Sequence, residues 1–455
     1  MAHIPEKIKL RDYQKEAIDS WIGNRLSGIF EMATGTGKTI TAISAMVKVL
    51  EKCSENNINC GIVIVVPYKV LLEQWVENLN LFDIDPIKCY DSRIKWENEL
   101  YHKIKRYNNG SLKNLFVITT NSTFNGEVFQ KQLNNIRREY IFCIDEMHHA
   151  ATNKYLKNLP QNTNIRLGLS ATLDSLYNNG NLDKLKEYFG GIVYNFSMKR
   201  AIDEGFLTPY YYNPIFVELT NYELEEYKEL SEKITKLIVK KDLNSEEEEI
   251  LQRLLLKRAR ILYTCENKLV KLKEMKDMIK GTQYNIFYCG DKIEDEDKYI
   301  HKVNRVVAND FSLKTHTFTA EESKKEREEI ISDFKEGKLD AISAIRCLDE
   351  GVDIPELRTA FILSSSTNPK EFIQRRGRVL RLCNGKEYAT IYDFMVIPSL
   401  DKDFFKTLPY DEKIIEKKIF DKEVKRFIEF STLAINCTEA YNKIMDVWDM
   451  YDFIY

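Results

Sequence analysis

The sequence predicts an α/β protein with two parallel-sheet domains, and three observations support this fold class. Short β-rich apolar runs alternate with helix-length stretches before residue 200, and the same alternation returns after residue 280. Between them, residues 223–280 contain no glycine or proline and repeat apolar residues at helical spacing. A glycine-rich turn follows the first apolar run. Continuous apolar strands joined by helices are typical of parallel sheets covered on both faces.

Buried strands are expected wherever apolar, β-branched residues run continuously. In chain order, these runs are residues 28–31, 61–67, 115–120, 140–145, 285–290, 341–345, 359–364 and 389–393. Two or three helices are expected in residues 223–280, with Asn244 as the N-cap of one of them. The chain is helical again from about Asp411. The predicted divisions are a first domain, a helical insertion, a second domain and a helical extension, at residues 1–197, 198–280, 281–400 and 401–455.

Composition narrows the class of protein without fixing its partners. A chain of 455 residues with 44% hydrophobic and 30% charged residues is globular and long enough for two or three domains. Nine scattered cysteines without a CxxC pair indicate reduced thiols, and six histidines without HExxH give no case for a dedicated metal site. A net charge of −3 neither supports nor excludes nucleic acid. With no signal pattern or membrane-spanning run, a cytoplasmic protein without a membrane partner is expected.

A glycine-rich turn lies between the first expected strand and the helix expected from Ile40 to Leu50. Glycines let backbone N–H groups turn toward phosphate oxygens, and the helix N-terminus adds partial positive charge. Lys38 is expected to reach the β- and γ-phosphates of ATP, and the Thr39 hydroxyl to bind Mg²⁺. The strict pattern has glycine at position 32, where this chain has Met32. The turn reads Ala33-Thr34-Gly35-Thr36-Gly37-Lys38-Thr39.

An acidic pair ends the strand expected at residues 140–145. Asp145 and Glu146 would lie at the carboxyl edge of the sheet, where ligands bind in α/β folds. Asp145 is expected to hold Mg²⁺, partly through water, and Glu146 to orient and deprotonate the attacking water. Alone, such a pair is as often an ordinary solvated loop. The phosphate-binding turn upstream favours the catalytic interpretation.

Together these motifs belong to a longer ordered series that resembles superfamily 2 helicases and translocases over residues 8–396. His149 and the runs 205–209 and 365–369 are similar to the branch that holds the helicase subunits of type I and type III restriction enzymes and the excision-repair helicases. The resemblance implies two tandem RecA-like domains with a helical insertion and a short helical C-terminal extension. Besides the turn, the series contains residues 10–14, 65–67, 119–120, 145–148, 170–172, 349–355 and 374–381.

The resemblance implies a role for each matched residue. Gln14 would read the adenine edge, beside the phosphate contacts of Thr34, Gly35, Thr36 and Gly37. Gly351 and Asp353 would meet the nucleotide from the second domain. Arg378 and Arg381 would be arginine fingers that act when the domains close. A basic patch for phosphate backbone is the less favoured interpretation of the four arginines, and the two roles are not exclusive. Coupling between hydrolysis and movement would involve His148, Ser170, Thr172 and Gln374.

The expected strand contacts lie across both domains. Backbone and hydroxyl groups can hold phosphates without reading sequence, and Tyr68 could stack on a base or simply pack. Motif V of the family has a threonine or serine near position 346, where this chain has Arg346 and Cys347, so the identity of the contacting hydroxyl is open. The candidates are Pro67, Tyr68, Lys69, Thr119, Thr120 and Arg346.

The predicted function is an ATP-dependent helicase or translocase that uses Mg²⁺, with DNA favoured over RNA by the branch resemblance. Two alternatives stay open. One is the motor subunit of a restriction or antiviral defence complex acting with a separate nuclease, because the chain contains no nuclease cluster. The other is an ATP-gated clamp or scaffold, against which the intact catalytic motifs argue. Residues 221–280 and 411–455 either brace the second domain or dock a protein partner.

Overall fold

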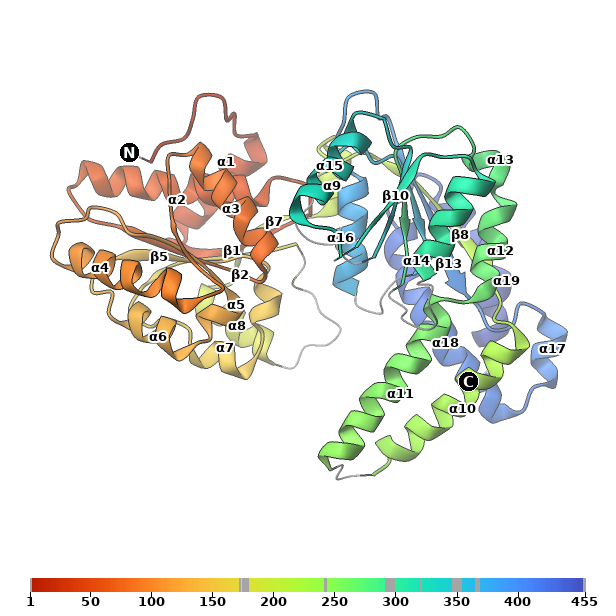
Figure 1. Cartoon of the computed structure of the whole chain (residues 1–455). Coiled ribbons are helices and arrows are strands. Elements are labelled where there is room, and N and C mark those ends of the chain that lie inside the picture. The colour runs from red at the N-terminus through yellow and green to blue at the C-terminus, as the bar shows by residue number, and fades with distance from the viewer. Residues whose placement is uncertain are drawn as a thin grey trace. The chain divides into compact units, whose positions relative to one another are not determined.

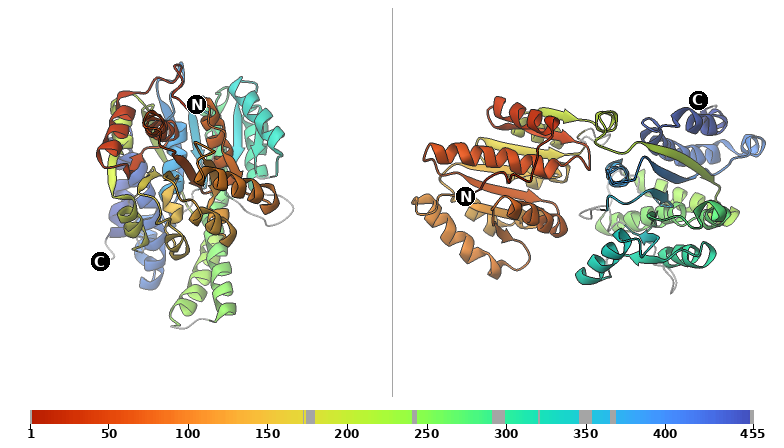
Figure 2. Two further views of the ribbon diagram at one scale, coloured as in Figure 1. Left: turned by 90° about the vertical axis from the view of Figure 1, so that its left-hand side faces the viewer. Right: turned by 90° about the horizontal axis from the view of Figure 1, so that it is seen from above.

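The structure is a computed structural model that divides into two compact units, Met1–Gly205 and Phe206–Tyr455. Each unit holds one parallel β-sheet with helices on both of its faces (Figure 1, Figure 2). This confirms the predicted fold class. The structure describes residues 2–171, 173, 180–240, 244–290, 299–319, 321–345, 354–364 and 369–452.

The first unit is built on a seven-stranded sheet whose order is β3-β4-β2-β5-β6-β1-β7. Every pairing in it is parallel, so the carboxyl ends of the strands share one edge. The central strand β2 is buried along its whole length, as its unbroken aliphatic run predicts. The strands are β1 (Ser27–Met32), β2 (Gly61–Val66), β3 (Ile87–Cys89), β4 (Phe116–Thr120), β5 (Tyr140–Ile144), β6 (Ile165–Ser170) and β7 (Ile192–Phe196).

Helices connect these strands and cover the sheet. Helix α2 is longer than the sequence predicted, since it begins at Lys38 and continues beyond Leu50. The helices are α1 (Asp12–Gly23), α2 (Lys38–Glu55), α3 (Lys69–Leu81), α4 (Glu97–Asn108), α5 (Asn121–Phe124), α6 (Glu127–Asn134), α7 (Asn153–Lys157), α8 (Asn181–Phe189) and α9 (Met198–Asp203), with 3₁₀ turns at Arg93–Lys95 and Met147–Ala150.

The second unit contains a six-stranded parallel sheet in the order β10-β11-β9-β12-β13-β8. The range 198–280 was expected as a helical insertion, but it also contributes the edge strand β8. The sequence of β8 mixes tyrosine, asparagine and proline, and so it lacks the continuous aliphatic run that marks the other strands. The strands are β8 (Tyr210–Val217), β9 (Asn285–Tyr288), β10 (Thr315–Phe318), β11 (Ala341–Ala344), β12 (Thr359–Ile362) and β13 (Ala389–Val396).

The long helices of the second unit frame its sheet. Asn244 caps α11 as predicted, because its side chain accepts a hydrogen bond from Glu247 N and Glu247 bonds back to Asn244 N. The helices are α10 (Asn221–Ile238), α11 (Ser245–Tyr263), α12 (Glu266–Glu274), α13 (Lys276–Ile279), α14 (Tyr299–Arg305), α15 (Lys324–Lys335), α16 (Pro369–Val379), α17 (Lys402–Thr407), α18 (Tyr410–Ser431) and α19 (Cys437–Asp452), with a π-helical segment at Val306–Asp310.

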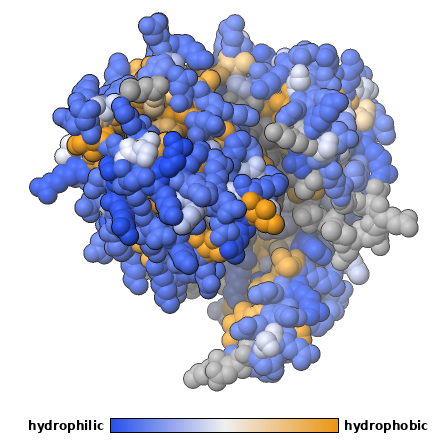
Figure 3. All heavy atoms as spheres, turned by 60° about the vertical axis from the view of Figure 1, so that its left-hand side comes forward, coloured by the Kyte–Doolittle hydropathy of each residue, from blue (hydrophilic) through white to orange (hydrophobic). Residues whose placement is uncertain are grey.

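Helices α10 and α11 form a hairpin whose base is buried and whose far end is exposed (Figure 1). Tyr227, Leu230 and Ile261 join the hydrophobic core beneath the sheet, as does Ile419 of α18. The hairpin therefore braces the second unit at its base. Figure 3 shows apolar atoms on the hairpin within a face that is mostly hydrophilic. The exposed apolar side chains there include Ile238, Val239, Leu255 and Leu256.

Strand β8 forms one edge of its sheet, and the segment between α18 and α19 covers the start of that edge. The Asn436 side-chain amide donates to Tyr212 O (3.0 Å) and accepts from Tyr212 N (2.9 Å), while Ile435 N donates to Tyr210 O (2.9 Å). Pro214 follows and has no N–H to offer. These contacts hold the C-terminal helices against β8.

A buried ion pair joins α18 to β13. Asp393 is fully buried, and its Oδ2 accepts hydrogen bonds from Arg426 Nε (2.9 Å) and the Tyr212 hydroxyl (2.9 Å). Arg426 also donates to both Glu423 oxygens, at 3.1 and 2.6 Å. Burial opposes the charge of Arg426, but Asp393 and Glu423 raise its pKa well above the usual value. The guanidinium thus bonds to two carboxylates inside the second unit.

Arg426→Met is expected to destabilise the second unit by about 3–5 kcal/mol, because Asp393 would remain buried without its cation. Denaturant unfolding of the full chain, followed by a probe of the second unit, measures the change. The matched control is Arg253→Met on the exposed face of α11, where the ion pair with Glu249 contributes at most about 1 kcal/mol. Equal shifts for the two variants would contradict the assignment.

Candidate functional site

The turn between β1 and α2 has the conformation that its glycines predict. Gly35 and Gly37 have φ values of +90° and +81°, in the left-handed region that favours glycine. A Cβ atom on Gly37 would also lie 2.9 Å from Gln14 Nε2. The Thr36 hydroxyl donates to Ala33 O at 2.7 Å and is buried. The turn is therefore fixed in shape, and Lys38 is the first residue of α2.

Helix α1 holds the turn from one side. The Tyr13 hydroxyl donates to Thr36 O (2.6 Å), and its ring stacks on Phe196 with centroids 4.0 Å apart. Gln14 Nε2 donates to Thr41 Oγ1 (3.1 Å), and Gln14 Oε1 accepts from Arg11 N (2.9 Å). Both ends of the Gln14 amide thus have protein partners in this structure. The sequence reasoning did not single out Tyr13, although it lies inside the quoted motif.

The acidic pair lies directly beside Lys38, at the carboxyl end of β5. Lys38 Nζ is 3.0 Å from Glu146 Oε1 and 3.8 Å from Asp145 Oδ1. Glu146 has φ +44°, unusual for a residue with a Cβ, and this turn directs its carboxylate toward Lys38. Asp145 Oδ2 accepts a hydrogen bond from Trp75 Nε1 of α3 at 2.8 Å. Trp75 is a site residue that the sequence reasoning missed.

Burial and mutual charge set the ionisation of this cluster. Burial raises the pKa of Asp145 above its ordinary range, even with Lys38 nearby. Burial also opposes ionisation of Glu146, but Lys38 and His148 outweigh it and lower its pKa to about 2. For Lys38, burial opposes the charge, yet Glu146 and Asp145 raise its pKa. Lys38 and Glu146 are therefore both ionised and form an ion pair with each other.

The side-chain rings of His148, His149 and Tyr68 lie in a row that starts beside the acidic pair. His148 Nδ1 is 3.5 Å from Glu146 Oε2, and the His148 and His149 ring centroids are 4.2 Å apart. His149 meets the edge of Tyr68 at 5.4 Å. The ring series His148–His149–Tyr68 thus connects the acidic pair with the residue just before α3. The sequence predicted a linking role for His148 but not this route.

The residues of the turn fit a bound phosphate chain. The start of α2 presents its N–H groups beside the Lys38 ammonium, and this combination binds anions. Within the described part of the chain, the buried Thr34 hydroxyl makes no hydrogen bond, and neither does Glu146 Oε2, whose nearest partner is His148 Nδ1 at ion-pair distance. Such unpaired buried groups are costly and favour a ligand that pairs with them. Thr39 lies half-buried in the first turn of α2.

The expected strand-contact residues lie at neighbouring strand ends, because Val66 of β2 pairs with Thr120 of β4. Tyr68 is 43% exposed, and Lys69 pairs with Asp91 at 2.7 Å. Thr119 is fully buried and donates to Cys89 O (2.8 Å), so its hydroxyl is already used inside the sheet. Thr120 caps α5 and contacts the exposed Ser122 hydroxyl at 3.0 Å. Pro67 lies between β2 and α3 and is buried.

The arginines of the second unit's last motif do not form a uniform basic patch. Arg375 is buried and donates to Ser364 O (3.0 Å), and Arg376 is buried against Glu429 (2.5 Å) and the Tyr210 hydroxyl (3.2 Å). Arg378 and Arg381 are half-buried, while Gln374 is buried. Two arginines therefore hold α16 in place, and the two predicted fingers are the more accessible ones.

Lys386 caps the end of α16 and was missed by the sequence reasoning. Its ammonium donates to Val379 O (2.5 Å), Arg381 O (2.8 Å) and Pro355 O (3.2 Å). Burial lowers its pKa to about 8. These bonds fix the backbone that carries Arg381. In the first unit, Ser170 is buried at the end of β6.

Four predicted site residues lie outside the described part of the chain: Thr172, Arg346, Gly351 and Asp353. Among the residues that are described, no helix combines the length and apolar character needed to cross a bilayer.

Comparisons with known proteins agree with this geometry. Residues 7–175 match the family described as type III restriction enzyme, res subunit, and residues 267–383 match the helicase conserved C-terminal domain. The chain is 28% identical over 397 residues to a protein of Sulfurisphaera tokodaii named DNA 3'-5' translocase XPB2, covering 83% of this chain and 80% of the relative. Two further helicase relatives are longer, and this chain spans 64% and 51% of their lengths.

Two solved structures share the fold. The ATP-dependent type ISP restriction-modification enzyme LlaBIII, bound to DNA, aligns with a TM-score of 0.63 and 16% identity over 94% of this chain and 30% of that protein. The Hef helicase domain of Pyrococcus furiosus aligns with a TM-score of 0.54 and 18% identity over 90% and 99%. By these two family matches and these relatives, the chain is similar to the superfamily 2 helicases and translocases, in the branch of restriction-enzyme and XPB-like helicases.

Proposed function

We propose that this protein hydrolyses ATP in the presence of Mg²⁺ and uses the energy to move along DNA, as a translocase or a helicase. The observation that carries this proposal is the junction of Lys38, Asp145 and Glu146 beside a preformed phosphate-binding turn. The choice of DNA is supported by the relative named a DNA 3'-5' translocase and by the structure titled as bound to DNA.

In this proposal Lys38 leaves Glu146 to bind the nucleotide phosphates. Thr39 and Asp145 hold Mg²⁺, and Glu146 orients the attacking water and takes its proton. Bound Mg²⁺-ATP supplies the phosphoanhydride and a metal ion that neutralises developing charge. Without Lys38 beside it, Glu146 loses its main pKa-lowering partner and becomes a stronger base. The resting ion pair thereby keeps the base inactive until phosphate arrives.

Further groups come from both domains. Arg378 and Arg381 act as arginine fingers on the leaving phosphate, worth about 10³–10⁵ in rate, and Gly351 and Asp353 meet the nucleotide. Lys386 positions the turn that carries Arg381. Gln14 reads adenine, which requires its amide to exchange a protein partner for the base. Movement is coupled to hydrolysis through His148, Ser170, Thr172 and Gln374.

The DNA strand runs past the ends of β2 and β4. Tyr68 and Lys69 are exposed enough to contact it, together with Pro67, Thr120 and Arg346. For the Thr119 contact, the buried hydroxyl leaves only its backbone, and the exposed Ser122, which bonds to Thr120, offers a hydroxyl at the surface nearby. Contacts of this kind hold phosphates without reading base sequence.

A protein partner is a second part of the proposal. The restriction-enzyme neighbour is more than three times longer than this chain's matching region, and the motor could act beside a separate nuclease. The exposed apolar side chains of the α10–α11 hairpin favour it as the docking element. An ATP-gated clamp without turnover is the remaining alternative.

Glu146→Gln is expected to reduce DNA-stimulated ATP hydrolysis by about 10²–10⁴-fold, because the general base is lost. ATP binding should persist, since Lys38 and the turn are intact. Steady-state hydrolysis and nucleotide titration measure the two effects. Glu187→Gln, on α8 away from the turn, is the matched control. Equal hydrolysis by Glu146→Gln and the parent would contradict the motor proposal and favour the clamp.

Trp75→Phe is expected to move the acid side of the ATPase pH profile to higher pH. The Trp75 N–H stabilises the ionised form of Asp145, so its loss raises a pKa that burial has already raised. Asp145 must be ionised to hold Mg²⁺, and activity would then fall at a higher pH as pH is lowered. Trp96→Phe is the control, because the Trp96 indole N–H is buried without a partner in the same unit. If the pH profile of Trp75→Phe matched that of the parent, the proposed role of Asp145 in holding Mg²⁺ would be contradicted.

Single-stranded DNA, duplex DNA and RNA should differ as activators of the ATPase. DNA is expected to stimulate hydrolysis more than RNA of the same length, and a displacement assay on a tailed duplex separates unwinding from translocation alone. Stimulation by RNA only would overturn the substrate assignment while leaving the ATPase intact.

A further inference from the structure

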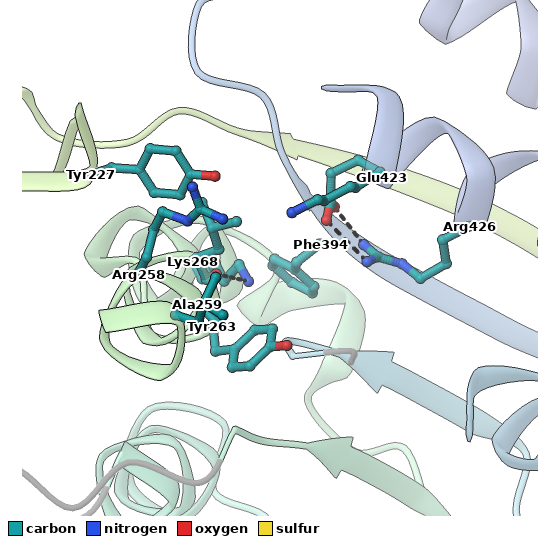
Figure 4. A pocket seen from close by; sticks show the side chains of 11 residues that line it. Tyr227, Arg258, Ala259, Tyr263, Lys268, Phe394, Glu423 and Arg426 are labelled. Carbon is teal, nitrogen blue, oxygen red and sulfur yellow. Dashed lines mark hydrogen bonds and ion pairs between the residues drawn. The ribbon is translucent and has the colours of Figure 1, made fainter. Parts of the chain in front are cut away.

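A cavity of about 210 Å³ lies inside the second unit, far along the chain from the motifs described above (Figure 4). Its walls come from the base of the α10–α11 hairpin, from α12, from β13 and from α18. Aromatic rings of Tyr227, Tyr263 and Phe394 line part of it. The motor motifs use none of these residues.

Four basic side chains converge on this cavity: Arg258, Lys268, Lys422 and Arg426. Lys268 is only 3% exposed and donates to Leu262 O and Leu363 O, at 2.7 and 2.6 Å. A lysine has three N–H donors, so one is left. Arg258 donates to Ser231 Oγ (3.2 Å) and lies over the Tyr227 ring at 5.5 Å, leaving other guanidinium donors.

The carboxylates near the cavity, Glu423 and Asp393, both form hydrogen bonds with Arg426. Glu423 lines the wall, but both of its oxygens bond to Arg426, as the dashed lines in Figure 4 mark, and Arg426 also binds the buried Asp393. Two acids thus face four cations, which leaves net positive charge in this wall, and Arg258, Lys268 and Lys422 have no carboxylate bonded to them. Among the described side chains, neither Arg258 nor Lys422 has a carboxylate within ion-pair distance.

Uncompensated like charges in a partly desolvated wall are unfavourable. Burial of part of the side chain lowers the pKa of Lys422, and the repulsion from Arg258 lowers it further against the weaker attraction of Glu423. An anion in the cavity would remove it and gain charge-assisted hydrogen bonds. Arginine and lysine together suit phosphate oxygens, and the enclosed volume suits a small group better than a polymer backbone.

We propose that this cavity is a binding site for the phosphate or pyrophosphate group of a small phosphorylated molecule. Arg258, Lys268 and Lys422 supply its donors, and the aromatic wall is available to the rest of the ligand. Because α11 contributes Arg258 and α18 contributes Lys422, the ligand ties the hairpin base to the C-terminal helix. The site stands independently of the proposed motor activity.

Inorganic pyrophosphate is the probe, titrated by calorimetry into the full chain without divalent cations. The chain carries Lys38→Ala so that the phosphate-binding turn does not contribute. Lys422→Gln is expected to weaken binding about tenfold or more, as loss of a charged donor does. Among the described residues Lys422 forms no ion pair, and its removal relieves repulsion from Arg258, so the thermal midpoint should not fall. Arg258→Gln should weaken binding similarly, and Arg258→Lys should retain part of it.

Lys425→Gln is the matched control, because Lys425 is exposed on the same helix but does not line the cavity. Its affinity should equal that of the parent within about twofold, the scatter expected for a surface charge. Absence of pyrophosphate binding, or equal affinity in Lys422→Gln, would overturn the proposal. If pyrophosphate does not bind but Lys422→Gln weakens single-stranded DNA binding, the cations serve a nucleic-acid backbone instead.

Discussion

The ion pair between Lys38 and Glu146 is the interaction around which the first unit is organised. Two carboxylates and one ammonium lie at the carboxyl edge of a parallel sheet, where burial makes an unpaired charge costly. Several neighbouring contacts reduce that cost. Trp75 donates a hydrogen bond to Asp145, and Tyr13 holds the turn in place. Glu146 adopts a left-handed backbone conformation, which brings its carboxylate to Lys38. The architecture of this edge follows from placing one ammonium beside two buried carboxyl groups before any phosphate is present.

In the second unit, too, two buried arginines are paired with charges of opposite sign. Arg376 is buried and paired with Glu429 of α18, and Arg426 of α18 is buried and paired with Asp393 of β13, so both arginines hold α18 in place. Arg378 lies in α16 and Arg381 lies just beyond its end, and both side chains are half-buried. Within this one short motif, two arginines are thus buried in structural contacts, while the two that we propose as arginine fingers are more accessible. Lys386 completes the arrangement by fixing the turn after the helix.

The sequence predicted what local pattern determines. Continuous aliphatic runs located most central strands, and Asn244 located a helix start, because both signals lie within a few residues. It could not predict contacts between distant segments. Trp75 reaches Asp145 across 70 positions, and β8 depends on β13 rather than on its own composition. Thr119 matched a motif, yet its hydroxyl direction follows from the pleat and from Cys89 on the neighbouring strand.

The cover over β8 has a consequence for the molecule in a crowded solution. An exposed strand at the margin of a sheet is a template on which a second chain can add its own strand, and such additions lead to aggregates. Here the Asn436 amide takes the donor and acceptor of Tyr212 that an incoming strand would need, and Pro214 removes the next donor along. The second sheet therefore cannot readily grow into a neighbour from this side, and the protein gains protection against self-association.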